Sequence, residues 1–223
     1  MNALMLLALL AADPLRVRVG TGGHPHDTAF YQLFATMDFT TTIDGHPSLY
    51  AGDLRRRNDV LVLYDMVQIA GTGQRQRLRE FAEAGKGVVI LHHAFCSFTD
   101  WDWYRDELMG GAYRFTDAPG KPKSTYAHDL SVVVKKVADH PVVKGLPAEF
   151  TVVDELYKNT TILPSNQVLL ATEHKAGDGP LVWISPYKKS NVVVILLGHD
   201  HQVHLDANYQ RLVRNAIQWA GGR

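Results

Sequence analysis

The sequence contains one cysteine, Cys96, among its 223 residues. A single thiol rules out an internal disulfide and any zinc site built from several cysteines. The sequence also lacks a net charge, because its 23 basic residues balance its 23 acidic ones. Such a chain lacks the field that draws basic proteins to nucleic acid or to anionic lipid, so we expect no nucleic-acid partner and no membrane partner.

Long apolar runs are also scarce. The N-terminal segment 3–12 (ALMLLALLAA) is apolar but too short to span a bilayer. Residues 1–12 are either a signal peptide or an N-terminal helix, and no Lys or Arg precedes the apolar run as it would in most signal peptides. We prefer export to the periplasm or the extracellular space over a cytoplasmic location, and assign residues 13–223 to one domain.

From residue 15 onward, strand-like and helix-like segments alternate, which predicts an α/β protein. Strands are predicted at 15–20, 40–43, 59–64, 88–91 and 192–197, of which 59–64 and 192–197 are buried, and helices at 28–37, 73–84 and 208–220. This spacing indicates a mainly parallel central sheet with helices on both faces. Further strands at 130–137, 150–153, 168–172 and 181–184 follow one another without long helices, so we expect them to extend the sheet in antiparallel orientation.

Polar side chains follow several of these strands at the point where each is predicted to end. They are His24 and His26, the pair His92–His93, the group Asp154, Glu155 and Tyr157 after Val152–Val153, and the cluster His199, Asp200, His201 and His204. Ligands of open α/β sheets bind outside the carboxyl ends of the strands. We therefore expect these groups to gather at one edge of the sheet.

Each group also has a plainer interpretation. In a continuing strand, His92 and His93 would point to opposite faces, so only one of them would enter a pocket. Asp154 and Glu155 are either an exposed pair at a strand end, or Glu155 is a general base. In the second case the Tyr157 hydroxyl either orients Glu155 or binds the substrate. Histidines beside carboxylates also suit a divalent metal, which stays an alternative.

Aromatic residues and the thiol are less informative. Trp103, with Trp101 and Tyr104, either stacks on a sugar ring or covers the sheet from a short helix. Cys96 has apolar neighbours that raise a thiol pKa, so we expect a structural cysteine rather than a nucleophile.

An ordered set of short motifs resembles the ThuA-like (trehalose utilization) domain family. The set comprises TGGH (21–24), GKGVVILHHAF (85–95), Trp103–Tyr104 before Gly110–Gly111, DHPV (139–142), KGL (144–146), DELY (154–157), LVW (181–183), GHD (198–200) and AIQWA (216–220). The resemblance covers nearly everything from residue 16 on. It implies a flavodoxin-like three-layer sandwich of the class I glutamine amidotransferase-like superfamily, and a role in the metabolism of keto-disaccharides or glycosides.

The resemblance assigns site residues by position: His24, His92, His93, Glu155, Tyr157, His199 and Asp200. We predict that His93, His199, Glu155 and His92 are catalytic, and that His24, Tyr157, Asp200 and Trp103 bind substrate. True amidotransferases carry a cysteine within a glycine-flanked turn after the fourth strand. Here that turn reads Leu91-His92-His93-Ala94, so we expect no glutaminase activity.

Three functional hypotheses follow. In the first, histidines and Glu155 transfer protons beside the carbonyl of a keto-sugar, giving isomerisation, elimination or hydration. In the second, the histidines hold a divalent metal that hydrolyses a sugar derivative. In the third, the protein binds a carbohydrate without catalysis. The sequence leaves open whether the chain forms a homo-oligomer. Apart from the divalent metal of the second hypothesis, it implies no cofactor.

Overall fold

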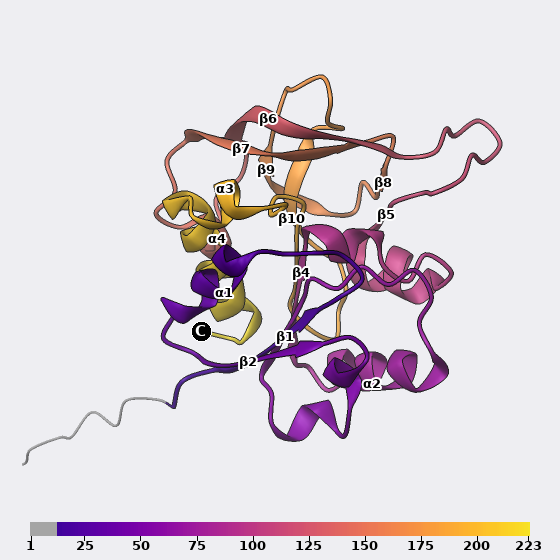
Figure 1. The fold of residues 1–223 in the computed structure, drawn as a ribbon, viewed down its shortest axis with the longest axis vertical. Helices are drawn as coiled ribbons and strands as arrows, with labels where there is room; N and C mark the ends of the chain where they lie inside the picture. Colours follow the sequence, from indigo (N-terminus) through magenta and orange to yellow (C-terminus); the bar gives the residue numbers. More distant parts are fainter. Residues whose placement is uncertain (1–12) are drawn as a thin grey trace, which may run out of the picture.

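The computed structural model describes residues 13–223, so the prediction of a signal peptide or helix at residues 1–12 lies outside the described residues. Within them, one large sheet has nine strands in the order β2-β1-β3-β4-β11-β10-β9-β6-β7. Figure 1 shows this sheet running through the molecule with helices on either side of it. The α/β class and the layered architecture predicted from the sequence are confirmed.

One half of the sheet is parallel. It consists of β2 (Thr40–Gly45), β1 (Arg16–Thr21), β3 (Val60–Leu63), β4 (Gly87–Leu91) and β11 (Val192–Ile195). The last three of these strands are buried along their whole length, because helices cover both faces of this half. Their carboxyl ends therefore share one edge of the sheet.

The other half is antiparallel, as predicted. It contains β10 (Pro180–Ile184), β9 (Gln167–Ala171), β6 (Thr125–Lys136) and β7 (Glu149–Lys158). A small separate sheet pairs β5 (Gly111–Ala112) with β8 (Thr161–Ile162). Strand β7 is longer than the predicted 150–153, so Asp154, Glu155 and Tyr157 lie within the strand and not beyond its end.

Helices divide between the two faces. On one face α1 (Thr28–Ala35) and α4 (Ala207–Ala220) pack on a core that includes Val89 and Leu91, whereas α2 (Thr72–Glu83) packs on the opposite core with Val88 and Ile90. The alternating side chains of a single strand thus fill two cores, which explains its unbroken apolar sequence. A short helix α3 (His201–His204), a π-helical segment (Trp103–Met109) and 3₁₀ turns (Ser48–Tyr50, Leu54–Arg56, His92–Cys96, Pro141–Val143) complete the chain.

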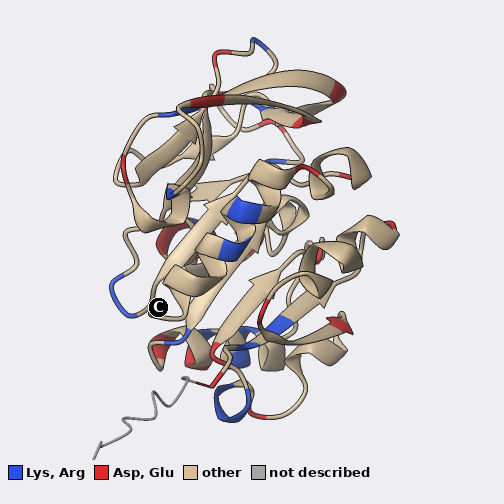
Figure 2. Cartoon of the chain, turned by 90° about the vertical axis from the view of Figure 1, so that its left-hand side faces the viewer, with Lys and Arg blue, Asp and Glu red and all other residues tan. Residues whose placement is uncertain are grey.

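The surface carries both signs of charge. Figure 2 shows basic and acidic residues interspersed over the side that it displays, as expected from their equal numbers. Among residues 13–223, no helix combines the length and the apolar character needed to cross a bilayer.

Candidate active site

Three histidines from separate strands meet at the carboxyl edge of the parallel half. His24 follows β1, His93 follows β4 and His199 follows β11. The ring centroids of His24 and His93 are 3.9 Å apart, and those of His93 and His199 are 5.4 Å apart. The expected convergence of distant imidazoles is therefore observed, and it arises because the three strands are parallel.

The turn after β4 brings both of its histidines into this cluster. Of the pair, only His93 lines a pocket with Glu155, as the interpretation from a strand required, but the reason is not a continuing strand. The strand stops at Leu91, and a 3₁₀ helix begins at His92, whose φ is +36°. This uncommon backbone conformation turns both rings toward His199, at centroid distances of 5.4 Å for each. A non-glycine residue in such a conformation is frequent at functional sites.

His92 is fully buried and held at both ring nitrogens. Its Nδ1 donates to the carbonyl oxygen of Leu196 at 2.6 Å, since that oxygen can only accept. Its Nε2 lies 3.0 Å from the Tyr157 hydroxyl and 3.3 Å from Oε1 of Glu155. His92 thus fixes the position of the carboxylate and of the tyrosine at the same time.

Glu155 is the centre of the cluster. Its side chain is only 5% exposed, and its Oε2 lies 2.9 Å from Nδ1 of His128 and 3.8 Å from Nδ1 of His199. His128 was missed by the sequence analysis because it falls early in β6, without an apolar run or a second histidine beside it. A bulge places it here: the pairing passes from Ala127–Leu156 to Leu130–Asp154, so that His128 and Asp129 stand opposite Glu155.

The neighbouring carboxylate, Asp154, binds backbone N–H groups rather than imidazole rings. It is buried and accepts hydrogen bonds from the backbone N–H groups of Gly198 (2.8 Å), His199 (2.9 Å) and Glu155 (2.8 Å). These bonds tie β7 to the turn after β11 and so set the position of His199. Burial raises the pKa of Asp154 to about 6, against the opposing effects of the nearby His92 and the three N–H donors.

Opposite charges stabilise Glu155 and His92 in their ionised forms. Burial alone would raise the pKa of Glu155, but its hydrogen bond to His92 and the charges of His92, His199 and His128 outweigh burial and hold the pKa below its usual value. Burial alone would lower the pKa of His92, but Glu155 and Asp154 reverse the effect and raise it. Glu155 is therefore an ionised carboxylate at neutral pH.

His93, unlike His92 and Glu155, is uncharged. It is 2% exposed, and neither ring nitrogen has a hydrogen-bond partner among residues 13–223. Burial and the neighbouring histidines, His92 first among them, lower the pKa of His93 far below its usual value, so the ring is neutral. Buried polar groups without a partner are rare and costly. An unpartnered imidazole at the wall of a pocket is therefore positioned to receive a ligand.

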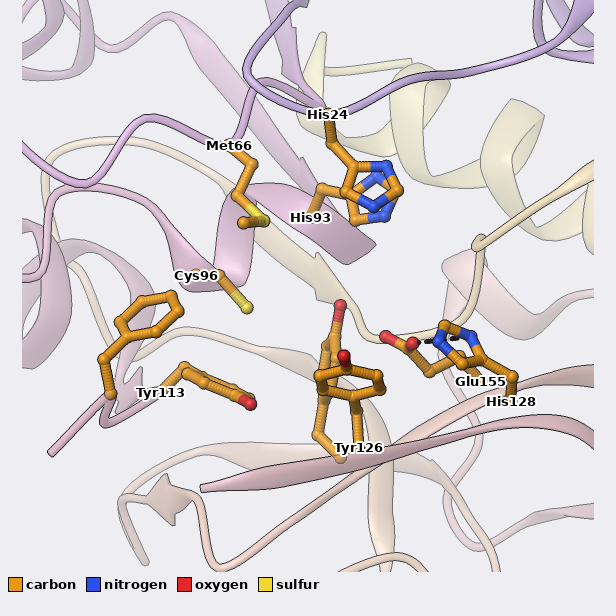
Figure 3. Close-up of a pocket in the computed structure, with 10 residues that line it drawn as sticks. His24, Met66, His93, Cys96, Tyr113, Tyr126, His128 and Glu155 are labelled. Atoms are coloured by element: carbon orange, nitrogen blue, oxygen red, sulfur yellow. Dashed lines mark ion pairs between the residues drawn. The ribbon is translucent and has the colours of Figure 1, made fainter. Parts of the chain in front are cut away.

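A pocket of about 190 Å³ opens beside these groups. Figure 3 shows the ring of His93, stacked with His24, and the carboxylate of Glu155, paired with His128, on different sides of the same hollow. The remaining wall is largely aromatic and apolar, formed by Met66, Cys96, Tyr113, Phe115, Tyr126 and Tyr157. Burial raises the pKa of the Cys96 thiol, which fits the prediction that this residue is not a nucleophile.

Two predicted substrate-binding residues lie elsewhere. The Trp103 ring is buried against Trp101 and Tyr187 under the guanidinium of Arg79, so that it covers the sheet and does not line the pocket. Asp200 caps α3 by accepting from the backbone N–H of Gln202 at 2.8 Å. The geometry therefore contradicts Trp103 as a stacking platform for this pocket and assigns Asp200 to the helix end.

The cluster also offers two sets of metal-ligating atoms. His92, His93 and His199 form one set and His128, Glu155 and His199 the other; within each set the atoms lie within 4.8 Å of one another. His93 and Nδ1 of His199 have no hydrogen-bond partner among the described residues, which leaves their lone pairs available. Nε2 of His92, however, is already engaged by Tyr157 and Glu155.

Structures of similar fold come from several bacteria. A ThuA-like protein from Parabacteroides merdae has a TM-score of 0.80 at 20% identity, covering 93% of this chain and 90% of that one. Another, from Bacteroides uniformis, has a TM-score of 0.71 at 21% identity, covering 96% and 94%. PurLQS from Thermotoga maritima has a TM-score of 0.61 at 12% identity, covering 93% and 99%. These likenesses show that the chain shares its fold with these proteins.

The sequence itself gives the family. No curated protein matched the chain. The family model described as ThuA, trehalose utilisation, matches residues 17–220. Because this match spans nearly the whole of the described chain, the protein belongs to the ThuA family.

Proposed function

We propose that the protein catalyses proton transfer beside the carbonyl group of a keto-sugar or keto-glycoside. The observation that carries the proposal is the pairing, across one pocket, of an ionised carboxylate with a neutral imidazole. Glu155 and His93 both line this pocket, and neither ring nitrogen of His93 is occupied by a described residue. A carboxylate base with a neutral imidazole that polarises the carbonyl is an established arrangement for enolisation.

In the proposed reaction, Glu155 removes the proton from the carbon next to the carbonyl. The electron pair moves into the new C=C bond, and the carbonyl oxygen becomes an enolate oxygen that accepts a hydrogen bond from His93. In an isomerisation, a histidine of the cluster passes the proton of the hydroxyl on the neighbouring carbon to the enolate oxygen. Glu155 then returns its proton to the former carbonyl carbon, and the C=O bond re-forms at the neighbouring carbon. Expelling a β-hydroxyl or alkoxyl group, protonated by an imidazolium of the cluster, completes an elimination, and hydration is the reverse of eliminating water.

The other residues act on these two. His92 and His128 hold Glu155 in its ionised form, and His199 stands 3.8 Å from the same carboxylate. His24 stacks on His93 and restricts its ring. Tyr157 lines the pocket with its hydroxyl directed to His92, where it is available to a substrate oxygen. Preorganised groups of this kind need little rearrangement as charge develops.

The test is incubation of the purified protein with 3-keto-disaccharides, with product analysis by NMR. We expect turnover in the wild type and a loss of at least about 100-fold in Glu155→Gln and in His93→Ala, the scale for removing a general base or an electrophilic donor. Undiminished turnover in both variants would show that these residues do not carry the reaction.

A metal-dependent hydrolase is the second candidate, favoured by the three imidazoles His92, His93 and His199. Elemental analysis of protein purified without a histidine tag separates it from the first. A stoichiometric divalent ion, together with loss of activity in chelator and its return with added metal, would support the hydrolase. Full activity without metal would leave proton transfer by the side chains.

Glutaminase activity is not proposed, because the turn after β4 carries His92 at its strained position, and the only thiol in the sequence, Cys96, lies four residues further on. A non-catalytic sugar-binding role would be distinguished by saccharide binding without product in any variant.

A further inference from the structure

A second hollow adjoins the pocket that holds Glu155 and His93. It measures about 350 Å³ and is lined by Tyr113, Phe115, Lys123, Ser124, Thr125 and Tyr126. Three of these residues, Tyr113, Phe115 and Tyr126, also line the inner pocket. The two spaces therefore share an aromatic wall, and Figure 3 shows two of its residues, Tyr113 and Tyr126, on the side of the pocket away from His24.

The shared wall exposes two large rings. Phe115 is 38% exposed and Tyr126 is 59% exposed, whereas Tyr113 is buried behind them. Large exposed apolar side chains are few among the described residues, and two of them lie together at this one opening. Exposed apolar surface rimmed by polar groups is typical of a ligand-binding groove.

The loop that carries Phe115 is held at its base. The Tyr113 and Phe115 centroids are 4.9 Å apart. The segment between Phe115 and Ser124 is closed at its base: Ser124 donates its backbone N–H to the Arg114 carbonyl at 2.8 Å, and the Tyr113 hydroxyl donates to the Ser124 carbonyl. A loop held in this way loses less conformational entropy when a ligand packs on it.

The outer surface is continuous with the reacting groups. Tyr126 and His128 stand two residues apart on β6, with ring centroids 5.0 Å apart, and His128 contacts Glu155. Since Tyr126 lines both spaces, a ligand in the inner pocket can extend past Tyr126 into the outer hollow. The inner pocket alone is smaller than the roughly 300–1,000 Å³ of most small-molecule sites, and the outer hollow supplies the difference.

We propose that Phe115 and Tyr126 form a second sugar-binding site, which holds the second ring of a two-ring glycoside while its oxidised ring occupies the inner pocket. The C–H face of a sugar ring packs on the exposed aromatic faces, and Lys123, Ser124 and Thr125 offer polar groups to its hydroxyls. A protein partner fits less well, since a stable interface buries about 800 Å² on each side and two exposed rings do not provide it.

The second sugar-binding site rests on the proposed function in one respect only, namely that the ring in the inner pocket is a keto-sugar. It is tested with the 3-keto derivatives of trehalose, which has two rings, and of methyl α-glucoside, which has one. In Phe115→Ala and Tyr126→Ala, we expect kcat/KM for the two-ring substrate to fall about three- to tenfold, the size of one aromatic contact. Because both residues also line the inner pocket, kcat/KM for the one-ring substrate should fall as well, but by a clearly smaller factor than for the two-ring substrate. Val133→Ala is the matched control, because Val133 is also exposed on β6 but lines neither hollow.

Binding of unoxidised trehalose and methyl α-glucoside, measured by NMR titration, tests the site without turnover. Preferential binding of trehalose that both variants abolish supports the second site even if no reaction occurs, in which case the proposed function alone fails. The second site would be overturned if the variants lost kcat/KM or affinity equally for the two saccharides, or lost none for trehalose. A concentration-dependent dimer that Phe115→Ala or Tyr126→Ala dissociates would also overturn it, because the surface would then bind a second copy of the chain.

Discussion

The Nδ1 atom of His128 lies 2.9 Å from Oε2 of Glu155, opposite the point where the regular pairing of β6 and β7 is interrupted. Asp129, the adjoining residue in the interruption, has a φ of +54°. Bulges of this kind bend a strand and redirect side chains, and they are frequent beside active sites. The bulge thus supplies a second imidazole, besides His92, that keeps Glu155 ionised.

Removing His128 should impair the reaction more than the fold. Its side chain is 44% exposed, so we expect His128→Ala to change the free energy of unfolding by less than about 0.5 kcal/mol. Turnover of a keto-sugar should fall by about tenfold or more, because Glu155 loses one of its two closest partners. Thermal unfolding and kcat measured together check this, with His174→Ala as the control outside the pocket. A large loss of stability with normal turnover would contradict the assignment.

The two adjacent histidines should respond in opposite ways. His93 makes no hydrogen bond to any described residue, so His93→Leu removes an unpaired buried polar group, and we expect unchanged or higher stability with turnover abolished. His92→Leu leaves Glu155 and the Leu196 carbonyl without their partner, and we expect a loss of about 3 kcal/mol. Urea denaturation of the two variants makes the comparison. Equal destabilisation would show that His93 has a structural role.

Asp154 should act as a positioning residue. In Asp154→Asn a single oxygen remains to accept the N–H groups of Gly198 and His199, so the turn after β11 loosens. We expect a loss of about 1–3 kcal/mol in unfolding free energy and a lower kcat, with a smaller change in KM. Faster amide hydrogen exchange at Gly198 and His199 would be the direct sign. Unaltered exchange there would contradict the proposed link between the strands.

An acidic residue at the opposite edge of the sheet should make stability pH-dependent. Arg16 donates two side-chain bonds to Asp59, at 2.7 and 2.9 Å, and Lys86 a third at 3.0 Å. The hydrogen bond from Arg16 is the main cause that holds the pKa of Asp59 well below its usual value. A lowered folded-state pKa stabilises the protein above the unfolded value of about 3.9, and this stabilisation is lost as the pH falls.

Asp59→Asn should therefore lower stability at pH 7 by about 1 kcal/mol, or roughly 2–4 °C in Tm. The difference from the wild type should shrink as the pH is taken below 4. Asp139→Asn, at an exposed ion pair with Lys136, is the matched control and should have little effect at either pH. A difference that grows on acidification would have the wrong sign for this explanation.

Much of the fold follows from local sequence. The apolar runs at β3, β4 and β11 predicted buried parallel strands, and parallel order alone brings His24, His93 and His199 to one edge. The end of β7 was placed too early, because Asp154 and Glu155 interrupt the apolar pattern. They stay within the strand because backbone N–H groups and imidazoles satisfy their charges.

The missed features depend on contacts between distant segments. His128 needs the bulge in β6, which no residue pattern marked, and the orientation of His92 needs a positive φ and the Leu196 carbonyl. Trp103 was misassigned because an aromatic residue near a predicted site is equally suited to a core. In the structure the Arg79 guanidinium and neighbouring aromatic rings cover it.

The most direct test of the central claim is solvent exchange at carbon. The protein is incubated in D₂O with a 3-keto-disaccharide, and the carbon-bound hydrogens next to the carbonyl are followed by NMR. If Glu155 removes this proton, we expect enzyme-dependent deuterium incorporation at that carbon in the wild type and a loss of at least about 100-fold in Glu155→Gln. Incorporation at the same rate in wild type and Glu155→Gln, or turnover without any exchange or cleavage at that C–H bond, would contradict this claim.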